Sequence, residues 1–204
     1  MLALCMSVRN FWRDTGGGPV VQVHPLTKAI VDVLTLRNLG GGGHGCNNTD
    51  EALSQNRRFA HHAMFYGFLL CLASTCSAAF YEHVLGLVAP YPFLSVPVLL
   101  GTSGGVGMLV GTAGLIWVKV KSDPAPVAKA LLGNDYALLA QLLLSAGTGL
   151  VLLIWRDSRL MGPLLALHLG AVLSFFLALP YSKFVHGIYR SAALVRNAAE
   201  RPSK

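Results

Sequence analysis

The sequence predicts an all-α fold, an integral membrane four-helix bundle with both termini in the cytoplasm. Of its 204 residues, 53% are hydrophobic and only 12% are charged, which is too apolar for an ordinary soluble domain. Four apolar runs are each long enough to cross the roughly 30 Å hydrocarbon core of a bilayer; they cover residues 60–83, 94–118, 136–155 and 162–186. Basic residues gather before the first run, between the second and third, and after the fourth. The positive-inside rule places these three segments in the cytoplasm.

The formal net charge of +7 comes from basic residues that gather mainly in these three segments. It therefore indicates membrane lipid, and not nucleic acid, as the surroundings of the basic residues. The chain divides into a cytoplasmic N-terminal segment with a glycine-rich loop (1–56), a four-helix transmembrane domain (57–199) and a tail (200–204). The apolar residues 2–6 are too few for a signal peptide and lack a preceding basic region. We interpret them as a candidate end of a further spanning helix upstream.

Residues 1–56 contain two recognisable features. Residues 24–34 predict a short amphipathic helix, with Thr27 as a candidate N-cap. The stretch Gly40-Gly-Gly-Gly-His44-Gly-Cys46 has two interpretations, a linker or a docking loop to which His44 and Cys46 contribute polar groups. The four cysteines of the chain do not have the spacing of iron–sulfur ligands. We therefore expect any cluster to be bound elsewhere.

The second and third apolar runs are predicted to be structural. In the second run, four glycines at positions 104, 107, 111 and 114 follow a 3-4-3 spacing, which forms one stripe along a helix. Such a stripe suits close approach of a neighbouring helix, with a flat macrocycle as the alternative. The third run carries only Gln141 and a few Ser or Thr residues as polar groups.

The first and fourth runs carry histidines near both of their ends. His168 and His186 are 18 positions apart, which is five whole turns of one helix and about 27 Å along its axis. Both rings would then leave the helix on one side, one near each membrane face. On the first run, His61 and His83 are about 40° apart in phase, whereas His62 is about 60° off in the other direction. His61 therefore fits a common face slightly better than His62.

These histidines predict two haem sites. If the spans alternate in direction, His61 or His62 lies level with His186 on the cytoplasmic side, and His83 lies level with His168 on the outer side. Ionisable groups inside a span need partners, and facing imidazoles suit the two b-type haem irons of a bundle core. The alternative is that they are interfacial histidines with their polar tips at the headgroups. Cations that would balance the haem propionates are Arg57, Arg58, Lys183 and Arg190 inside, and Arg156 and Arg159 outside.

Three motifs resemble known families. Pro180-Tyr-Ser-Lys-Phe-Val-His186 resembles the Pro-Phe-Ser-(Arg/Lys)-Leu-Val-His signature of the nitrate reductase gamma-subunit superfamily of dihaem cytochromes b. Arg58-x-x-His61-x-x-x-Phe65-x-Gly67-Phe68 is similar to the first-helix pattern of several relatives. The loop at 40–48, together with the run from His61 to His83, resembles more closely the membrane half of the citrate/tricarballylate-utilisation family (TcuB, also called CitB). The resemblance covers residues 20–190, and we expect Pro180 to bend the fourth helix.

The resemblance implies a function in electron transfer at the inner membrane. Members of this family receive electrons from an FAD-dependent dehydrogenase through a ferredoxin-like domain with two [4Fe-4S] clusters, and pass them through haem b toward quinone. The cluster domain is missing from this chain, so a preceding segment or a separate polypeptide is expected to supply it. The chain is then one component of an oxidoreductase. The alternatives are a haem-free anchor for a peripheral dehydrogenase and a small transporter, although intramembrane carboxylates and repeat symmetry are missing for the latter.

Overall fold

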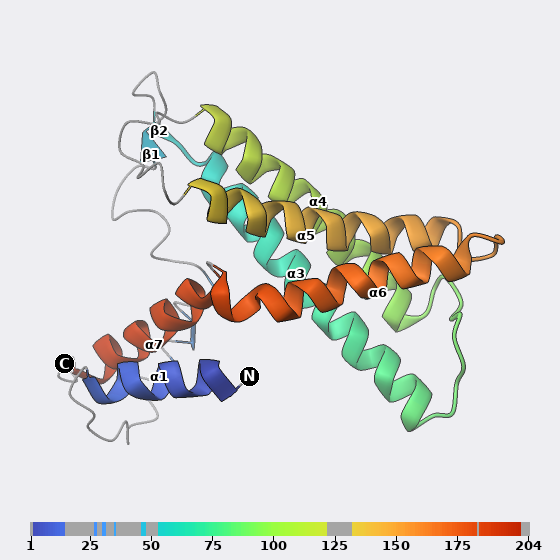
Figure 1. Ribbon diagram of the computed structural model, residues 1–204, viewed down its shortest axis with the longest axis horizontal. Helices are drawn as coiled ribbons and strands as arrows, with labels where there is room; N and C mark the ends of the chain where they lie inside the picture. The colour runs from blue at the N-terminus through green and yellow to red at the C-terminus, as the bar shows by residue number, and fades with distance from the viewer. Residues whose placement is uncertain are drawn as a thin grey trace. The chain divides into compact units, whose positions relative to one another are not determined.

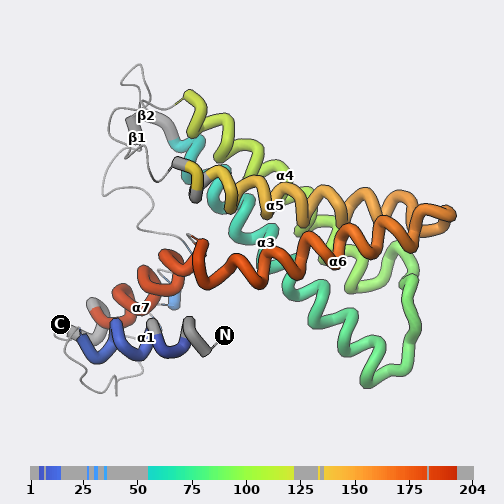
Figure 2. The backbone as a smooth tube through the Cα atoms, in the orientation of Figure 1, coloured from blue at the N-terminus to red at the C-terminus, as the bar shows by residue number. Residues whose placement is uncertain are grey.

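The computed structural model describes residues 2–14, 27, 30–31, 35, 46–47, 53–121, 132–182 and 184–200. They belong to two compact units, one formed by Met1–Gly43 with Phe176–Lys204 and the other by His44–Phe175. Figure 1 labels the helices and strands, and Figure 2 traces the path of the backbone. The described part is helical apart from one antiparallel pair of two-residue strands, β1 (Cys46–Asn47) and β2 (Leu53–Ser54). The predicted all-α fold class is confirmed.

The larger unit contains the four predicted spans. Its helices are α3 (Asn56–His83), α4 (Val96–Lys121), α5 (Leu132–Ile154) and α6 (Met161–Ala178) as far as Phe175, where the unit ends. The segments long and apolar enough to cross a membrane are Asn56–His83, Val96–Lys121, Tyr136–Ile154 and Met161–Tyr181. The first three agree with the predicted runs to within four residues. The fourth ends at residue 181, where the prediction extended it to 186.

Helices α3 and α4 pack backbone against backbone through the glycine stripe. A Cβ added to Gly104 would lie 2.7 Å from the Cys71 nitrogen and 2.8 Å from the Gly67 oxygen. A Cβ added to Gly111 would overlap the backbone nitrogen of Met64, and one added to Gly67 would overlap that of Met108. Small residues of this kind are what lets two helices approach closely in a membrane. The stripe therefore faces a helix, and the macrocycle interpretation of it was wrong.

Helix α5 lies on another side of α4 and is joined to α6 by polar contacts. A Cβ added to Gly105 of α4 would lie 3.0 Å from the Leu150 side chain of α5. The Gln141 amide of α5 donates hydrogen bonds to the carbonyl oxygen of Ala171 (2.7 Å) and to the hydroxyl of Ser174 (2.6 Å), both on α6. In a span, where water is not at hand, such bonds help to hold neighbouring helices together.

The fourth span is interrupted at Pro180. After α6 ends at Ala178, a 3-10 turn covers Leu179–Tyr181, Ser182 is extended (φ −91°, ψ 166°), and α7 runs over Phe184–Glu200. Proline has no N–H for the helix ladder and clashes with the preceding turn. The Ser182 hydroxyl then accepts the Phe184 N–H at 3.2 Å, as an N-cap does. The prediction of one helix over 162–186 was therefore wrong, and the count of five whole turns between His168 and His186 does not apply.

The smaller unit contains α1 (Leu2–Asp14) and α7, which pack together. The rings of Phe11 and Tyr189 lie 5.4 Å apart, and the Arg196 guanidinium lies 5.8 Å from the Trp12 ring centroid. Most of the predicted helix at 24–34 and the glycine-rich stretch 40–45 lie outside the described residues.

Replacing Gly111 by Ala should lower the thermal stability of the detergent-solubilised chain. The new Cβ overlaps α3 backbone, and relieving such overpacking costs about 1–3 kcal/mol. Gly147→Ala on α5 is the matched control, because nothing lies within 4 Å of a Cβ added there. Its better helix propensity, up to about 1 kcal/mol, should leave that variant neutral or slightly more stable. Loss of helical circular dichroism on heating measures both, and equal melting temperatures would contradict the packing described.

Candidate functional site

Helices α3 and α6 meet through two aromatic rings. Phe68 of α3 and Phe175 of α6 lie with their ring centroids 5.8 Å apart and their planes inclined at 55°; Figure 1 shows the two helices that carry them. Phe175 is 5% exposed. This contact identifies the side of each helix that is directed to the other.

His61 and His83 of α3 and His168 of α6 lie on, or within about 60° of, these facing sides. His61 precedes Phe68 by seven positions, and His168 precedes Phe175 by seven positions, so each lies about 20° from its phenylalanine around the helix. His83 follows Phe68 by fifteen positions and lies about 60° away. The structure therefore places a histidine-bearing side of α3 opposite a histidine-bearing side of α6.

His62 lies on a different side of α3. It is six positions before Phe68 and therefore about 120° away from it around the helix. Its Nδ1 lies 2.8 Å from the carbonyl oxygen of Arg58 on the same helix, and its ring centroid is 6.0 Å from that of Tyr66. Between the two candidates that the sequence leaves, the helix phase at the α3–α6 contact favours His61.

His168 is held by α5. Its Nδ1 lies 3.1 Å from the hydroxyl oxygen of Thr148, and a Cβ added to Gly149 would lie 2.9 Å from its Cε1 atom. The ring is half-buried. The sequence reasoning treated the third span as structural and missed both α5 residues. The sequence did contain a signal for Thr148. Thr148 and His168 are each ten positions from Ser158 in the α5–α6 connection. In a helical hairpin, residues equally far from the connection lie side by side.

His83 and His168 lie at different distances along their helices from the Phe68–Phe175 contact. Along α3, His83 lies fifteen residues beyond the contact, about 22 Å, whereas His168 lies seven residues from the contact along α6, about 10 Å. His83 is exposed at the end of its helix. The geometry thus supports His83 least among the predicted ligands.

The other predicted site residues that the structure describes are on α7 or in the first turn of α3. His186 and Arg190 are exposed residues of α7, in the smaller unit. Arg57 and Arg58 are exposed in the first turn of α3, in the larger unit. Lys183 lies outside the described residues. The two units are described separately, so pairing of His186 with His61 stays a prediction.

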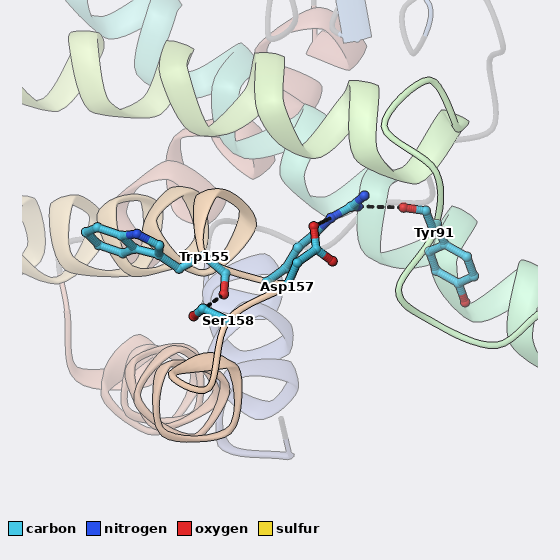
Figure 3. A network of polar contacts seen from close by, with 5 residues as sticks. Tyr91, Trp155, Asp157 and Ser158 are labelled. Atoms are coloured by element: carbon cyan, nitrogen blue, oxygen red, sulfur yellow. Dashed lines mark hydrogen bonds and ion pairs between the residues drawn. The ribbon is translucent and has the colours of Figure 1, made fainter.

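Arg156 joins the two connections at the far end of the larger unit. Its guanidinium donates a hydrogen bond to the carbonyl oxygen of Tyr91 (2.6 Å), stacks over the Phe93 ring at 3.7 Å, and pairs with Asp157 at 3.7 Å. Figure 3 shows Asp157 and Tyr91 at the two ends of this network. The side chain is only 13% exposed. Arg156 thus links residues 84–95 to residues 155–160. The sequence analysis predicted only a pairing of Arg156 with a haem propionate, and this structural role was not predicted.

In the part of the chain that the structure describes, these features define a helical protein with four helices long and apolar enough to span a membrane, two of which face each other with histidines. The sequence profile of the CitB family, described as Citrate utilization protein B, matches residues 1–204, so the chain belongs to this family. The Citrate utilization protein B of Escherichia coli is 45% identical to it over 200 residues, which are 97% of this chain and 52% of that protein. The chain thus spans about half the length of this curated relative. No solved structure matches it.

This finding confirms the predicted resemblance to the citrate/tricarballylate-utilisation family. The wider relation to the nitrate reductase gamma-subunit superfamily stays a prediction.

Replacing Arg156 by Gln should loosen the connection at 84–95. The variant loses a charged hydrogen bond and a cation–π contact, together on the order of 2 kcal/mol. Arg159→Gln is the control, since Arg159 is exposed and surface substitutions usually stay within about 0.5 kcal/mol. Hydrogen–deuterium exchange of residues 84–95 measures the difference. Equal exchange in the two variants would exclude the linking role of Arg156.

Proposed function

We propose that this chain is the electron-transfer membrane subunit of an oxidoreductase for citrate or tricarballylate utilisation. It takes electrons from an FAD-dependent dehydrogenase through a ferredoxin-like iron–sulfur domain or subunit, and passes them through two b-type haems to the quinone pool of the inner membrane. The observation that carries the proposal is the opposed histidine-bearing sides of α3 and α6, with the His168 ring held in place by α5. The name of the E. coli relative supports the substrate class.

The arrangement of α3 and α6 fits a group bound between them. The two helices meet through the large rings of Phe68 and Phe175, whereas α3 and α4 touch backbone to backbone. We infer that helices separated by rings leave more room for a flat group beside the rings than glycine-packed helices do. Imidazole is a common axial ligand of haem iron, and the His168 ring is already oriented by a hydrogen bond at Nδ1, as ligating histidines usually are.

Each residue then has a defined role. Bound haem would supply the capacity to accept and release one electron at a time. His61, His168 and His186 would hold the haem irons, with His83 as the fourth proposed ligand. Apolar side chains of α3 and α6 would exclude water, and cations near the cytoplasmic ligands would balance the propionates, namely Arg57, Arg58, Lys183 and Arg190.

The donor is proposed to dock on the cytoplasmic side. The positive-inside rule supports a cytoplasmic start of α3, and the glycine-rich stretch at 40–47 precedes α3 in sequence with residues 48–55 between them. About half of the E. coli relative has no counterpart in this chain, so the clusters are assigned to a separate domain or partner.

Substitution of the proposed ligands should lower haem content. His168→Ala and His186→Ala should each remove about half of the haem, because the two sites share no ligand. His61→Ala should resemble His186→Ala, whereas His62→Ala should be mild because His62 is on another side of α3. The visible spectrum of the purified protein before and after dithionite measures this. A wild-type protein without a Soret band would instead support a haem-free anchor for a peripheral dehydrogenase.

Reduction of the haem should depend on an iron–sulfur partner. The purified chain mixed with a reduced flavoprotein dehydrogenase should stay oxidised on the stopped-flow time scale, and a ferredoxin-like protein of the same system should restore reduction. Deleting residues 40–47 should slow this reduction without changing haem content, if the stretch is a docking loop. Rapid reduction by the flavoprotein alone, or an unchanged rate in the deletion variant, would speak against this route.

A further inference from the structure

The Thr148 hydroxyl has a single hydrogen, and the structure determines where it is directed. Its oxygen lies 2.8 Å from the carbonyl oxygen of Leu144 and 3.2 Å from that of Ser145, both one turn back on α5. A carbonyl oxygen can only accept, so the hydroxyl donates to its own helix. Thr148 is 8% exposed, which keeps water from competing for these contacts.

The hydrogen on His168 follows from this assignment. Because the Thr148 hydrogen is already donated, the Thr148 oxygen can only accept from the His168 Nδ1 atom that lies 3.1 Å away. In the neutral ring, Nδ1 therefore carries the hydrogen and Nε2 carries the lone pair, which is the form that binds a metal through Nε2.

Gly149 provides the space for this ring orientation. A Cβ at this position would lie 2.9 Å from Cε1, 3.4 Å from Nδ1 and 3.5 Å from Nε2 of His168. Contacts this short force the ring to move. The adjacent Thr148 and Gly149 thus act together, one through a hydrogen bond and the other through the lack of a side chain.

We propose that Thr148 is a positioning residue that fixes the tautomer of His168 and, with Gly149, its ring orientation, so that Nε2 is presented as an axial ligand. This inference rests on the proposed haem function for its ligand. Its hydrogen-bond part concerns only residues of this chain and is open to measurement without haem.

The first experiment measures the tautomer in the haem-free full-length chain. The protein is labelled with 15N-histidine, reconstituted in lipid vesicles and studied by solid-state NMR, with His168→Gln used to assign the His168 signals. Wild type and Thr148→Ser should show a single form protonated at Nδ1. Thr148→Val, which keeps the shape but removes the acceptor, should show a mixture of tautomers. Thr102→Val is the matched control, because the Thr102 hydroxyl donates to the Val98 carbonyl of its own helix and, among the described residues, contacts no histidine.

The second experiment measures haem retention by transfer to apomyoglobin. Loss of a hydrogen bond behind a metal ligand typically costs 10–100-fold in affinity, so Thr148→Val and Gly149→Ala should release one haem on the order of tenfold faster. Thr148→Ser, Thr102→Val and Gly147→Ala should match wild type. The low-spin EPR signal of that haem should also shift in Thr148→Val and return in Thr148→Ser.

The outcomes separate this inference from the proposed function. A wild-type chain that binds no haem refutes the proposed function, and the tautomer measurement then still decides the role of the Thr148 hydrogen bond. A wild-type chain that binds haem, with Thr148→Val indistinguishable from Thr102→Val in both tautomer and haem release, overturns the positioning role alone.

Discussion

The close packing of α3 on α4 is the constraint on which the rest of the larger unit depends. Lipid is as apolar as the side chains, so burial of apolar surface does not drive spanning helices together, and van der Waals contact decides how they dock. Gly67, Gly104 and Gly111 bring the two backbones into contact, which leaves α3 one favourable rotation about its axis. Phe68 follows Gly67 and so projects about 100° away from that contact. The glycines thereby direct Phe68, and His61 with it, to α6.

The α5–α6 hairpin has a different chemistry. Its contacts are polar: Gln141 bonds to Ala171 and Ser174 near one end, and Thr148 bonds to His168 nearer the connection. Unsatisfied polar groups are costly in a bilayer, so each of these side chains restricts how far the two helices can slide or rotate. The same restriction that aligns the hairpin orients the imidazole. Helix register and the orientation of the His168 ring are thus set by one group of hydrogen bonds.

The sequence predicts the spans well and the site only in part, for physical reasons. Apolar length and glycine spacing are local properties, so the four helices and the small-residue face of α4 can be recognised from residue order alone. The helix break at Pro180 was expected only as a bend, because the restart of α7 depends on the Ser182 cap. The role of Thr148 depends on its hydrogen bond to His168, twenty positions away. The role of Arg156 depends on its contacts with the Tyr91 carbonyl and the Phe93 ring. Contacts between segments cannot be read from periodicity within one segment.

The break at Pro180–Ser182 separates His168 from His186 mechanically. His168 is on α6 and tied to α5, whereas His186 is on α7, which packs with α1. A rigid helix would transmit any rotation at one histidine to the other, but an extended Ser182 between two helices does not. A displacement of α7, such as a partner protein would cause on contact, can therefore be absorbed at this joint while the His168 environment keeps its geometry.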